Sequence, residues 1–264
     1  MSAAESGPIK SAFMLILLPP SETKSTGGSG APLDLSSLSW PELADVRRSI
    51  ADDLVALSAD RDAAMAALKL GPKLADEVDA NAALFTSPTA PALDRYTGVL
   101  FDALDAGSLS PAARARLAVG SALFGVVGAE DLIPKYRLSG GSKIPLHDGP
   151  SAGATPTMRA RWGKSITRAL TEGDHGLIVD LRSGTYMNLG KVPGAITATV
   201  LTTDGNVVSH FNKHHKGLLA RALADAAGTS SRDIGSLDDA VDVARDAGLD
   251  ARAGDGGIIV TVPA

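Results

Sequence analysis

The stretch FMLILLPPSETKSTGGSG, residues 13–30, joins a short apolar run to two prolines and a polar, glycine-rich tail. The continuous apolar run at residues 13–18 predicts a strand buried on both faces, as in a parallel sheet. The prolines end the strand, because proline donates no hydrogen bond to a neighbouring strand. Ser21, Glu22 and Lys24 therefore follow the carboxyl end of a buried strand, which is where α/β sheets place ligand sites. A solvated loop is an equally good interpretation of this stretch taken alone.

Two familiar motifs are excluded by residue order. A phosphate-binding loop needs its glycines before the Lys-Ser/Thr pair, so that backbone N–H groups surround the phosphates. Here the glycines follow Lys24. A serine-hydrolase elbow needs Gly-x-Ser-x-Gly, and VGSALFG around Ser121 has no second glycine in place.

Composition places the chain among ordinary globular proteins. It has 264 residues, of which 44% are hydrophobic and 21% are charged, and a length of this kind fits one or two domains. The absence of cysteine excludes disulfides, thiolate metal sites and a cysteine nucleophile. The apolar run near the start is far too short to cross a membrane and lacks the flanks of a signal peptide. We therefore expect a soluble, cytoplasmic protein with no membrane partner.

Charge is distributed unevenly along the chain. Residues 135–221 carry 12 basic and 5 acidic side chains, whereas residues 1–134 carry 10 and 17, and residues 222–264 carry 3 and 8. A basic middle third is typical of proteins with an anionic partner such as phosphate, nucleotide or nucleic acid. Ion pairing with the acidic ends of the same molecule would explain it equally well.

The order of predicted elements indicates an α/β fold with a mixed central sheet and surrounding helices. We expect residues 1–12 to be a disordered extension and residues 13–264 to form one compact domain. Residues 40–106 are mainly helical, with Ser39 as the expected N-cap of the first helix. Strands and helices then alternate, because the apolar runs GLIVDL, AITATVLTT, VVSHF and GIIVTV are separated by helical patterns.

The segment LKLGPKLADEV, residues 68–78, predicts two helices joined by a Gly-Pro turn. A helix-hairpin-helix of this form binds DNA by directing backbone N–H groups at a phosphate, and Lys73 suits that role. Asp76, Glu77 and Asp79 oppose it, because carboxylates repel a phosphate backbone. An ordinary corner between two helices therefore remains the alternative.

Cations and aromatic residues recur through the middle of the chain, in the segments 136–138, 159–168 and 180–186. Arg182 and Ser183 follow the strand GLIVDL in the same way that Ser21 follows the first strand. Because parallel strands end at the same edge of a sheet, two such strand ends predict a convergent polar site.

Lys213, Lys216 and Arg221 lie near the start of a predicted helix. Cations there oppose the helix dipole, which is understandable if an anion binds. His210, His214 and His215 raise the alternative of a metal site, but adjacent histidines point in different directions. We therefore expect no bound metal and no cofactor.

Several segments, in this order, resemble the YaaA family of bacterial peroxide-stress proteins. They are MLILLPPSETK, YTGVLFDAL, LAVGSALFGVVGAEDLIPKYRL, RWGKSIT, IVDLRSGTY and SHFNKHHKGLLAR, and they span about residues 14–221. The chain departs from the family pattern at Glu22, which is added to the opening cluster, and at His214 and Lys216. The positions that match the family motifs are Ser21, Lys24, Tyr96, Gly98, Tyr136, Arg137, Trp162, Arg182, Ser183, Tyr186, Lys213, Lys216 and Arg221.

The resemblance implies a compact α/β fold with a helix-hairpin-helix and a positively charged cleft. It also implies a role in limiting damage by hydrogen peroxide, with lowered free iron and DNA binding proposed for the family. The leading hypothesis is therefore a peroxide-stress protein that binds single- or double-stranded DNA, or a nucleotide-like small molecule, in a basic cleft. The expected phosphate-binding and base-stacking residues are Lys73, Tyr136, Arg137, Arg159, Arg161, Trp162, Lys164, Arg182, Ser183, Tyr186, Lys213, Lys216 and Arg221.

Two alternatives stay open from the sequence. The first is an enzyme acting on a nucleotide, a nucleoside or a flipped base, by glycosidic or phosphoryl-related transfer. Its candidate catalytic residues are Ser21, Glu22, Lys24, Asp180, Arg182 and Tyr186. The second is an iron-binding protein that uses His210, His214, His215 and nearby carboxylates. Protein partners and the oligomeric state cannot be predicted from these residues.

Overall fold

Strand β1 (Met14–Leu18) is fully buried and lies in the middle of a seven-stranded sheet. The computed structural model describes residues 14–207, 209–229 and 233–263, without the side chains of Ser209 and His210. The predicted extension at residues 1–12 lies outside the described residues. Since all five side chains of β1 are apolar, this strand can be covered on both faces, as its sequence predicts.

The sheet has the order β4-β3-β1-β6-β7-β9-β8 and is mixed. Its five inner strands run parallel, and the two edge strands run antiparallel to their neighbours. The remaining strands are β3 (Leu117–Ser121), β4 (Gly125–Gly128), β6 (Leu177–Asp180), β7 (Ile196–Thr202), β8 (Ala251–Gly254) and β9 (Gly257–Val262), and a separate two-stranded ladder joins β2 (Ala90–Pro91) to β5 (Leu132–Ile133). The predicted mixed α/β class is thereby confirmed.

The connections place a topological switch point at β1. This strand pairs with β3 on one side, where Ile16 lies opposite Leu117, and with β6 on the other, where Leu17 lies opposite Asp180. The chain passes from β1 to β3 and later crosses to β6. The carboxyl ends of three adjacent parallel strands therefore lie together, and open α/β sheets bind their ligands at such a point.

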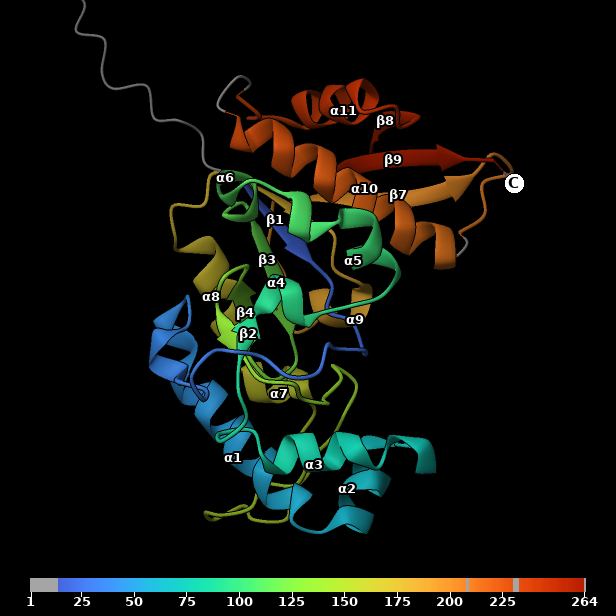
Figure 1. Ribbon diagram of the computed structural model, residues 1–264. Helices are drawn as coiled ribbons and strands as arrows, with labels where there is room; N and C mark the ends of the chain where they lie inside the picture. Colours follow the sequence, from blue (N-terminus) through green and yellow to red (C-terminus); the bar gives the residue numbers. More distant parts are fainter. Residues whose placement is uncertain (1–13, 208, 230–232, 264) are drawn as a thin grey trace, which may run out of the picture.

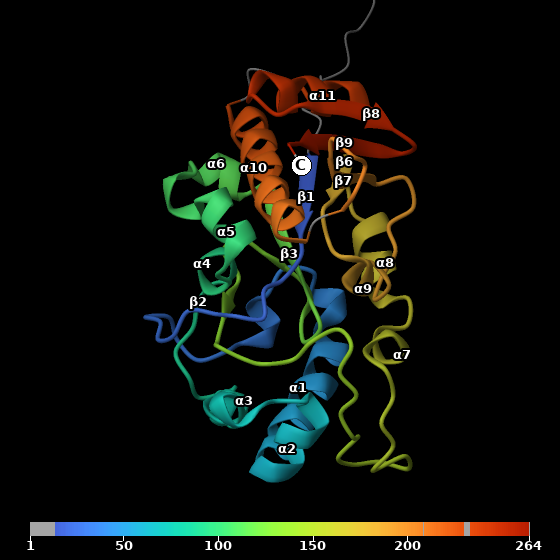
Figure 2. The same ribbon diagram turned by 90° about the vertical axis from the view of Figure 1, so that its right-hand side faces the viewer.

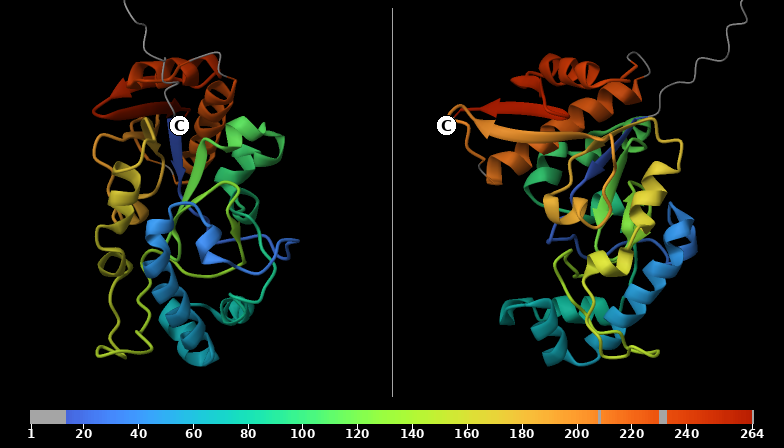
Figure 3. Two further views of the ribbon diagram at one scale, coloured as in Figure 1. Left: turned by 90° about the vertical axis from the view of Figure 1, so that its left-hand side faces the viewer. Right: turned by 180° about the vertical axis from the view of Figure 1, so that it is seen from behind.

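Helices cover both faces of the sheet. On one side of β1, α10 (Ser209–Gly228) packs against α5 (Val99–Leu104) and α6 (Pro111–Arg114), and α8 (Ser165–Thr171) lies on the other side (Figure 2). The short helix α4 (Ala92–Arg95) contacts β3 and β4, and α9 (Gly184–Met187) follows the carboxyl end of β6. Helix α7 (Met158–Trp162) lies below the sheet in Figure 1. Near the far edge, α11 (Leu237–Asp246) packs on β8 (Figure 3).

Three helices lie beyond the carboxyl ends of β1 and β3, as Figures 1 and 2 show. They are α1 (Ala44–Ser58), α2 (Arg61–Leu68) and α3 (Asp76–Ala82). The Arg47 side chain of α1 is buried and donates to the carbonyls of Phe124 and Val126, next to the sheet. The Asn81 side chain of α3 bonds both backbone groups of Arg137. The helical segment is thus fixed against the polar ends of the strands.

The turn between α2 and α3 has the predicted Gly-Pro form. Lys69 ends α2 in a left-handed conformation, with φ 55°, and Pro72–Leu74 forms a short 3₁₀ turn before α3. Ala64, Leu70 and Val78 make a small apolar cluster separate from the main core. Identification of this unit as a DNA-binding helix-hairpin-helix remains a prediction.

The structure differs from the sequence prediction in two places. The run VVSHF was expected to be a strand, but α10 already begins at Ser209, and Val208 lies outside the described residues. The Ser39 hydroxyl was expected to cap a helix, yet it donates to Asp131 at 2.8 Å. Instead a 3₁₀ turn at Pro41–Leu43 precedes α1. Within the described residues, no helix combines the length and the apolar composition needed to cross a membrane.

Candidate functional site

The loop after β1 is fixed by contacts on both of its sides. The Ser21 hydroxyl lies 3.1 Å from the Thr23 hydroxyl and accepts a hydrogen bond from the Thr23 N–H. Further on, Lys24 forms an isolated antiparallel bridge with Tyr96, and the Thr97 N–H donates to the Thr23 carbonyl at 3.3 Å. The polar cluster predicted from the sequence is therefore a folded loop at the switch point.

Lys24 is the central cation of this loop. Its Nζ donates to the Ser21 carbonyl at 2.9 Å and lies 4.4 Å from the Tyr136 ring centre and 5.2 Å from that of Tyr96. In the described part of the chain, no carboxylate comes within ion-pair distance of it. Desolvation on burial lowers the pKa of Lys24 to about 8, and the nearby charge of Glu22 opposes this only in part.

The two tyrosines beneath Lys24 belong to a buried hydrogen-bond chain. The Tyr136 hydroxyl lies 2.7 Å from both the Tyr96 hydroxyl and the Ser121 Oγ, at the carboxyl end of β3. Ser121 Oγ also accepts from the N–H groups of Leu123 and Phe124. Burial raises the pKa of Tyr96 to about 12 and that of Tyr136 well above its ordinary value. Both phenols are therefore neutral, and their ring faces are held in place for the Lys24 cation.

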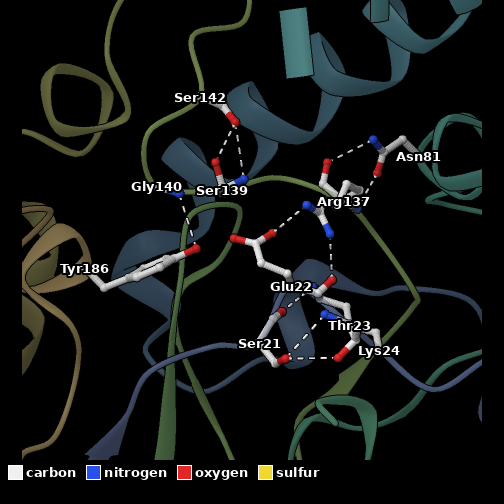
Figure 4. Close-up of polar contacts among 10 residues, drawn as sticks. All are labelled: Ser21, Glu22, Thr23, Lys24, Asn81, Arg137, Ser139, Gly140, Ser142 and Tyr186. Carbon is white, nitrogen blue, oxygen red and sulfur yellow. Dashed lines mark hydrogen bonds and ion pairs between the residues drawn. The ribbon is translucent and has the colours of Figure 1, made fainter. Parts of the chain in front are cut away.

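Glu22 lies between groups from two other segments (Figure 4). Its carboxylate is 3.1 Å from Arg137 Nη2, and Arg137 Nη1 donates to the Glu22 carbonyl at 3.1 Å. From the other side, α9 directs Tyr186 toward the same space, and the Tyr186 hydroxyl accepts from the Gly140 N–H at 3.2 Å. Burial raises the pKa of Tyr186 above its ordinary value. A carboxylate, a guanidinium and a phenol thus meet beside Lys24.

Asp180 and Arg182 form a buried ion pair at the carboxyl end of β6. Arg182 donates from Nε to Asp180 Oδ1 at 2.8 Å and from Nη2 to Oδ2 at 2.7 Å, and Nη2 also reaches the Gly190 carbonyl. Behind the pair, Lys216 Nζ donates to the Leu181 carbonyl at 3.2 Å, and burial lowers its pKa. Asp180 and Arg182 therefore satisfy each other at the strand end, and a catalytic or anion-binding role for either residue remains a prediction.

Several other predicted contact residues are buried or already paired within the protein. Trp162 is fully buried and donates to the Ala122 carbonyl at 2.9 Å, and Tyr136 is buried beneath Lys24. The expectation that either ring stacks on a base is therefore corrected, because neither has an exposed face. Arg161 is paired with buried Asp53, and Arg221 is paired with Asp225 at 2.6 Å.

Four of the predicted cations remain exposed and, among the described residues, have no acidic partner. They are Lys73, Arg159, Lys164 and Lys213. Ser183 is exposed just before α9, where its carbonyl accepts from the first turn of the helix. Gly98, with φ 103°, precedes α5, and a Cβ atom at this position would lie 3.4 Å from the Ser21 hydroxyl. The basic set therefore splits into structural arginines and a smaller group of available cations.

The histidines of α10 give limited support to an iron site. The rings of His214 and His215 lie 5.2 Å apart, and His215 Nδ1 is 3.0 Å from the Phe211 carbonyl. The described side chains include no group of three residues able to hold a metal ion. The side chain of His210 lies outside the described residues, so iron binding remains a prediction.

Several residues of the site were missed by sequence reasoning. Thr23, Asn81, Thr97 and Ser121 all contribute hydrogen bonds, but none lies in a pattern that distinguishes it from other polar residues. A cavity of about 510 Å³ lies at the opposite, amino end of the strands, lined by residues that include Leu15, Trp40 and His175. None of the predicted site residues lines it.

Comparison with known proteins adds a family to this geometry. A family model described as peroxide stress protein YaaA matches residues 14–241. The chain belongs to the YaaA family of peroxide stress proteins. The match includes the loop after β1, Tyr136, Arg137 and the end of β6, so the YaaA family unit contains the whole switch-point site.

Relatives in this family cover nearly the whole chain. A UPF0246 protein of Corynebacterium efficiens is 57% identical over 247 residues, which are 92% of this chain and 96% of that protein. A UPF0246 protein of Streptomyces coelicolor is 41% identical over 253 residues, covering 91% of this chain and 92% of the relative. An uncharacterized protein of Campylobacter jejuni is 26% identical over 212 residues, covering 78% and 82%. The similarity to these proteins therefore extends over most of the chain.

Proposed function

We propose that this YaaA-family protein acts in the cytoplasm under peroxide stress by binding DNA, with one nucleotide unit held at the carboxyl ends of β1, β3 and β6. The observation that carries the proposal is Lys24. It is a half-buried cation at the switch point, held by two ring faces and a carbonyl instead of a carboxylate. An anionic ligand group is the partner that such a cation lacks.

The surroundings of Lys24 suit a phosphate on a sugar. The positive charge of the Arg137 guanidinium helps to lower the pKa of Lys24, so two cations face the same region. Arg137 is held by the exposed carboxylate of Glu22, an ion pair that contributes little to stability and can open for a ligand. The hydroxyls of Ser21 and Thr23 provide further donors beside it.

In this proposal, the four exposed cations bind phosphates of the DNA that lie farther from Lys24. Lys73 lies on the helical segment beyond the strand ends, Arg159 and Lys164 lie in and after α7, and Lys213 lies on α10. Each phosphate that they neutralise releases counterions and makes binding weaker as salt rises. The acidic first turn of α3 is partly neutralised, because Glu77 pairs with Lys135 and Asp79 pairs with Arg61.

A titration of labelled single-stranded and duplex oligonucleotides across a salt series tests the proposal. We expect log Kd to rise linearly with log salt, and Lys24→Gln to weaken binding by roughly tenfold, as for a lost hydrogen bond to a charged group. Arg252→Gln is the matched control, because it removes one exposed positive charge at β8, on the far edge of the sheet. Equal effects of the two substitutions, or no binding to either DNA, would overturn the proposal.

A further inference from the structure

The Lys24 amine has hydrogen-bonding capacity that the folded protein does not use. An ammonium group has three donors, and the Lys24 Nζ makes one hydrogen bond within the described residues, to the Ser21 carbonyl. Its other neighbours are the faces of Tyr136 and Tyr96. By contrast, the guanidinium of Arg182 is committed to Asp180 and to the Gly190 carbonyl. Lys24 is therefore the basic group of the site that is best placed to react.

We propose that Lys24 is a nucleophile that forms an imine with the aldehyde of a phosphorylated sugar. The inference rests on the proposed function, because a site in which Lys24 and Arg137 face one phosphate also brings the sugar that carries this phosphate to the Lys24 amine. The sugar aldehyde has two natural sources, a damaged sugar within DNA and a free sugar phosphate. Oxidative damage to DNA leaves sugars without a base, whose ring opens to an aldehyde, so the first source agrees with the peroxide-stress family.

The environment of Lys24 supports this reactivity. An amine attacks a carbonyl only when it is neutral, and a lysine acquires that form near neutral pH when it is desolvated in an apolar pocket. Burial beside the two tyrosines lowers the pKa of Lys24 to about 8. Roughly one Lys24 side chain in ten is then neutral at pH 7, against well under one in a thousand for an ordinary lysine.

The step is balanced without a further reactant. The Lys24 nitrogen forms a bond to the aldehyde carbon, and the carbonyl oxygen takes up a proton, which gives a carbinolamine. The nitrogen lone pair then expels that oxygen as water, and the second amine hydrogen leaves as a proton, so amine and aldehyde yield imine and one water. Glu22 lies two residues before Lys24 in the same loop, where its carboxylate pairs with Arg137 (Figure 4), and we assign it the role of carrying these protons.

Trapping with sodium cyanoborohydride tests the inference on the full chain. The probes are an oligonucleotide with one abasic site, the same oligonucleotide intact, and ribose 5-phosphate. We expect a covalent adduct with the abasic oligonucleotide, found at Lys24 by peptide mass spectrometry, and none with the intact one. An adduct with ribose 5-phosphate but not with the abasic oligonucleotide would assign the site to free sugar phosphates.

Substitutions separate reaction from binding. Lys24→Arg keeps the positive charge but cannot form an imine, so we expect DNA binding to persist and at least nine-tenths of the adduct to be lost. Lys191→Arg changes an exposed lysine outside the site and should trap as the unaltered chain does. Lys24→Gln, checked for folding by its thermal midpoint, guards against an arginine that fits poorly.

The outcomes distinguish this inference from the proposed function. DNA binding without any adduct would overturn the imine and leave the binding proposal standing. An adduct on Lys24 with ribose 5-phosphate, in a chain that does not bind DNA, would support the imine and overturn the proposal of DNA binding. Adducts that persist in Lys24→Arg, or that map to Lys216 or to surface lysines, would show that Lys24 is not the nucleophile.

Discussion

The ammonium group of Lys24 lies 4.4 Å from the centre of the Tyr136 ring, and the Tyr136 phenol is fixed by hydrogen bonds to Tyr96 and Ser121. The cation is therefore stabilised by a ring face, an interaction worth about 1–2 kcal/mol when partly desolvated. A carboxylate in the same place would neutralise Lys24 and raise its pKa. The ring leaves the positive charge available to a ligand, which connects the packing beneath β1 to the proposed binding of an anion.

Lys24 should cost the protein stability at neutral pH. Its pKa in the folded protein, about 8, is below the ordinary value of 10.5, so the unfolded chain binds the proton more tightly. The penalty is complete below about pH 8 and disappears as the pH rises to 10.5. We expect Lys24→Met to raise the free energy of unfolding by about 1–2 kcal/mol at pH 7 and by much less at pH 10.5. Urea unfolding of both proteins at pH 7 and pH 10.5 measures this change in the free energy of unfolding. An equal change at the two pH values would contradict the lowered pKa of Lys24.

Tyr136 has two roles that different substitutions separate. Tyr136→Phe keeps the ring beneath Lys24 but leaves the buried hydroxyls of Tyr96 and Ser121 without their shared partner, which should cost about 1–2 kcal/mol. Tyr136→Leu removes the ring face as well. We expect DNA affinity to be retained in the first variant and reduced in the second, measured on protein that is folded at the assay temperature. Equal affinities would show that the ring does not position Lys24.

Glu22 should oppose ligand binding. Its carboxylate pairs with Arg137 and raises the pKa of Lys24, so it competes with an incoming phosphate for both cations. Glu22→Gln should therefore tighten DNA binding by a few-fold and change stability by less than about 1 kcal/mol, because the pair is exposed. Glu172→Gln, at the end of α8, is the control with the same charge change. Weaker binding in Glu22→Gln would indicate that Glu22 contacts the ligand favourably.

The Asp180–Arg182 pair should matter for folding more than for affinity. Asp180→Asn leaves the Arg182 guanidinium buried with one charged partner removed, which typically costs about 3–5 kcal/mol. The double substitution Asp180→Leu with Arg182→Met should recover much of that loss. Chemical unfolding of both variants tests this. A small effect of Asp180→Asn would mean that the pair is not a structural element of the strand end.

The sequence allowed the strand β1 and the polar loop after it to be predicted, but not the contacts within the candidate site. The apolar run of β1, the prolines after it and the polar residues that follow are local features, so the strand and the loop were both predictable. It could not be predicted which cations are already paired with carboxylates in the folded protein. Arg161 and Trp162 lie in a basic segment, yet their partners Asp53 and Ala122 are far away in the chain. A sequence shows the charge of an arginine, whereas only the fold shows whether a carboxylate already holds it.

Local capping rules failed for the same reason. Ser39 precedes a helical segment and has a suitable side chain. However, its hydroxyl and its N–H both donate hydrogen bonds to the carboxylate of Asp131, which lies 92 residues later in the chain. The start of α10 was also misjudged, because the apolar residues before it have the pattern of a short strand. In both cases a tertiary contact or a helix start outweighed the local propensity.

The titration of Lys24 itself tests the central claim most directly. In protein labelled with ¹³C at the lysine side chains, NMR follows each Cε signal with pH, and Lys24→Arg assigns the signal of Lys24. The account predicts a pKa near 8 in the free protein and a rise of at least about one unit when DNA saturates the site, because an adjacent phosphate favours the charged form. A Lys24 that titrates near 10.5, or that is unaffected by bound DNA, would contradict it.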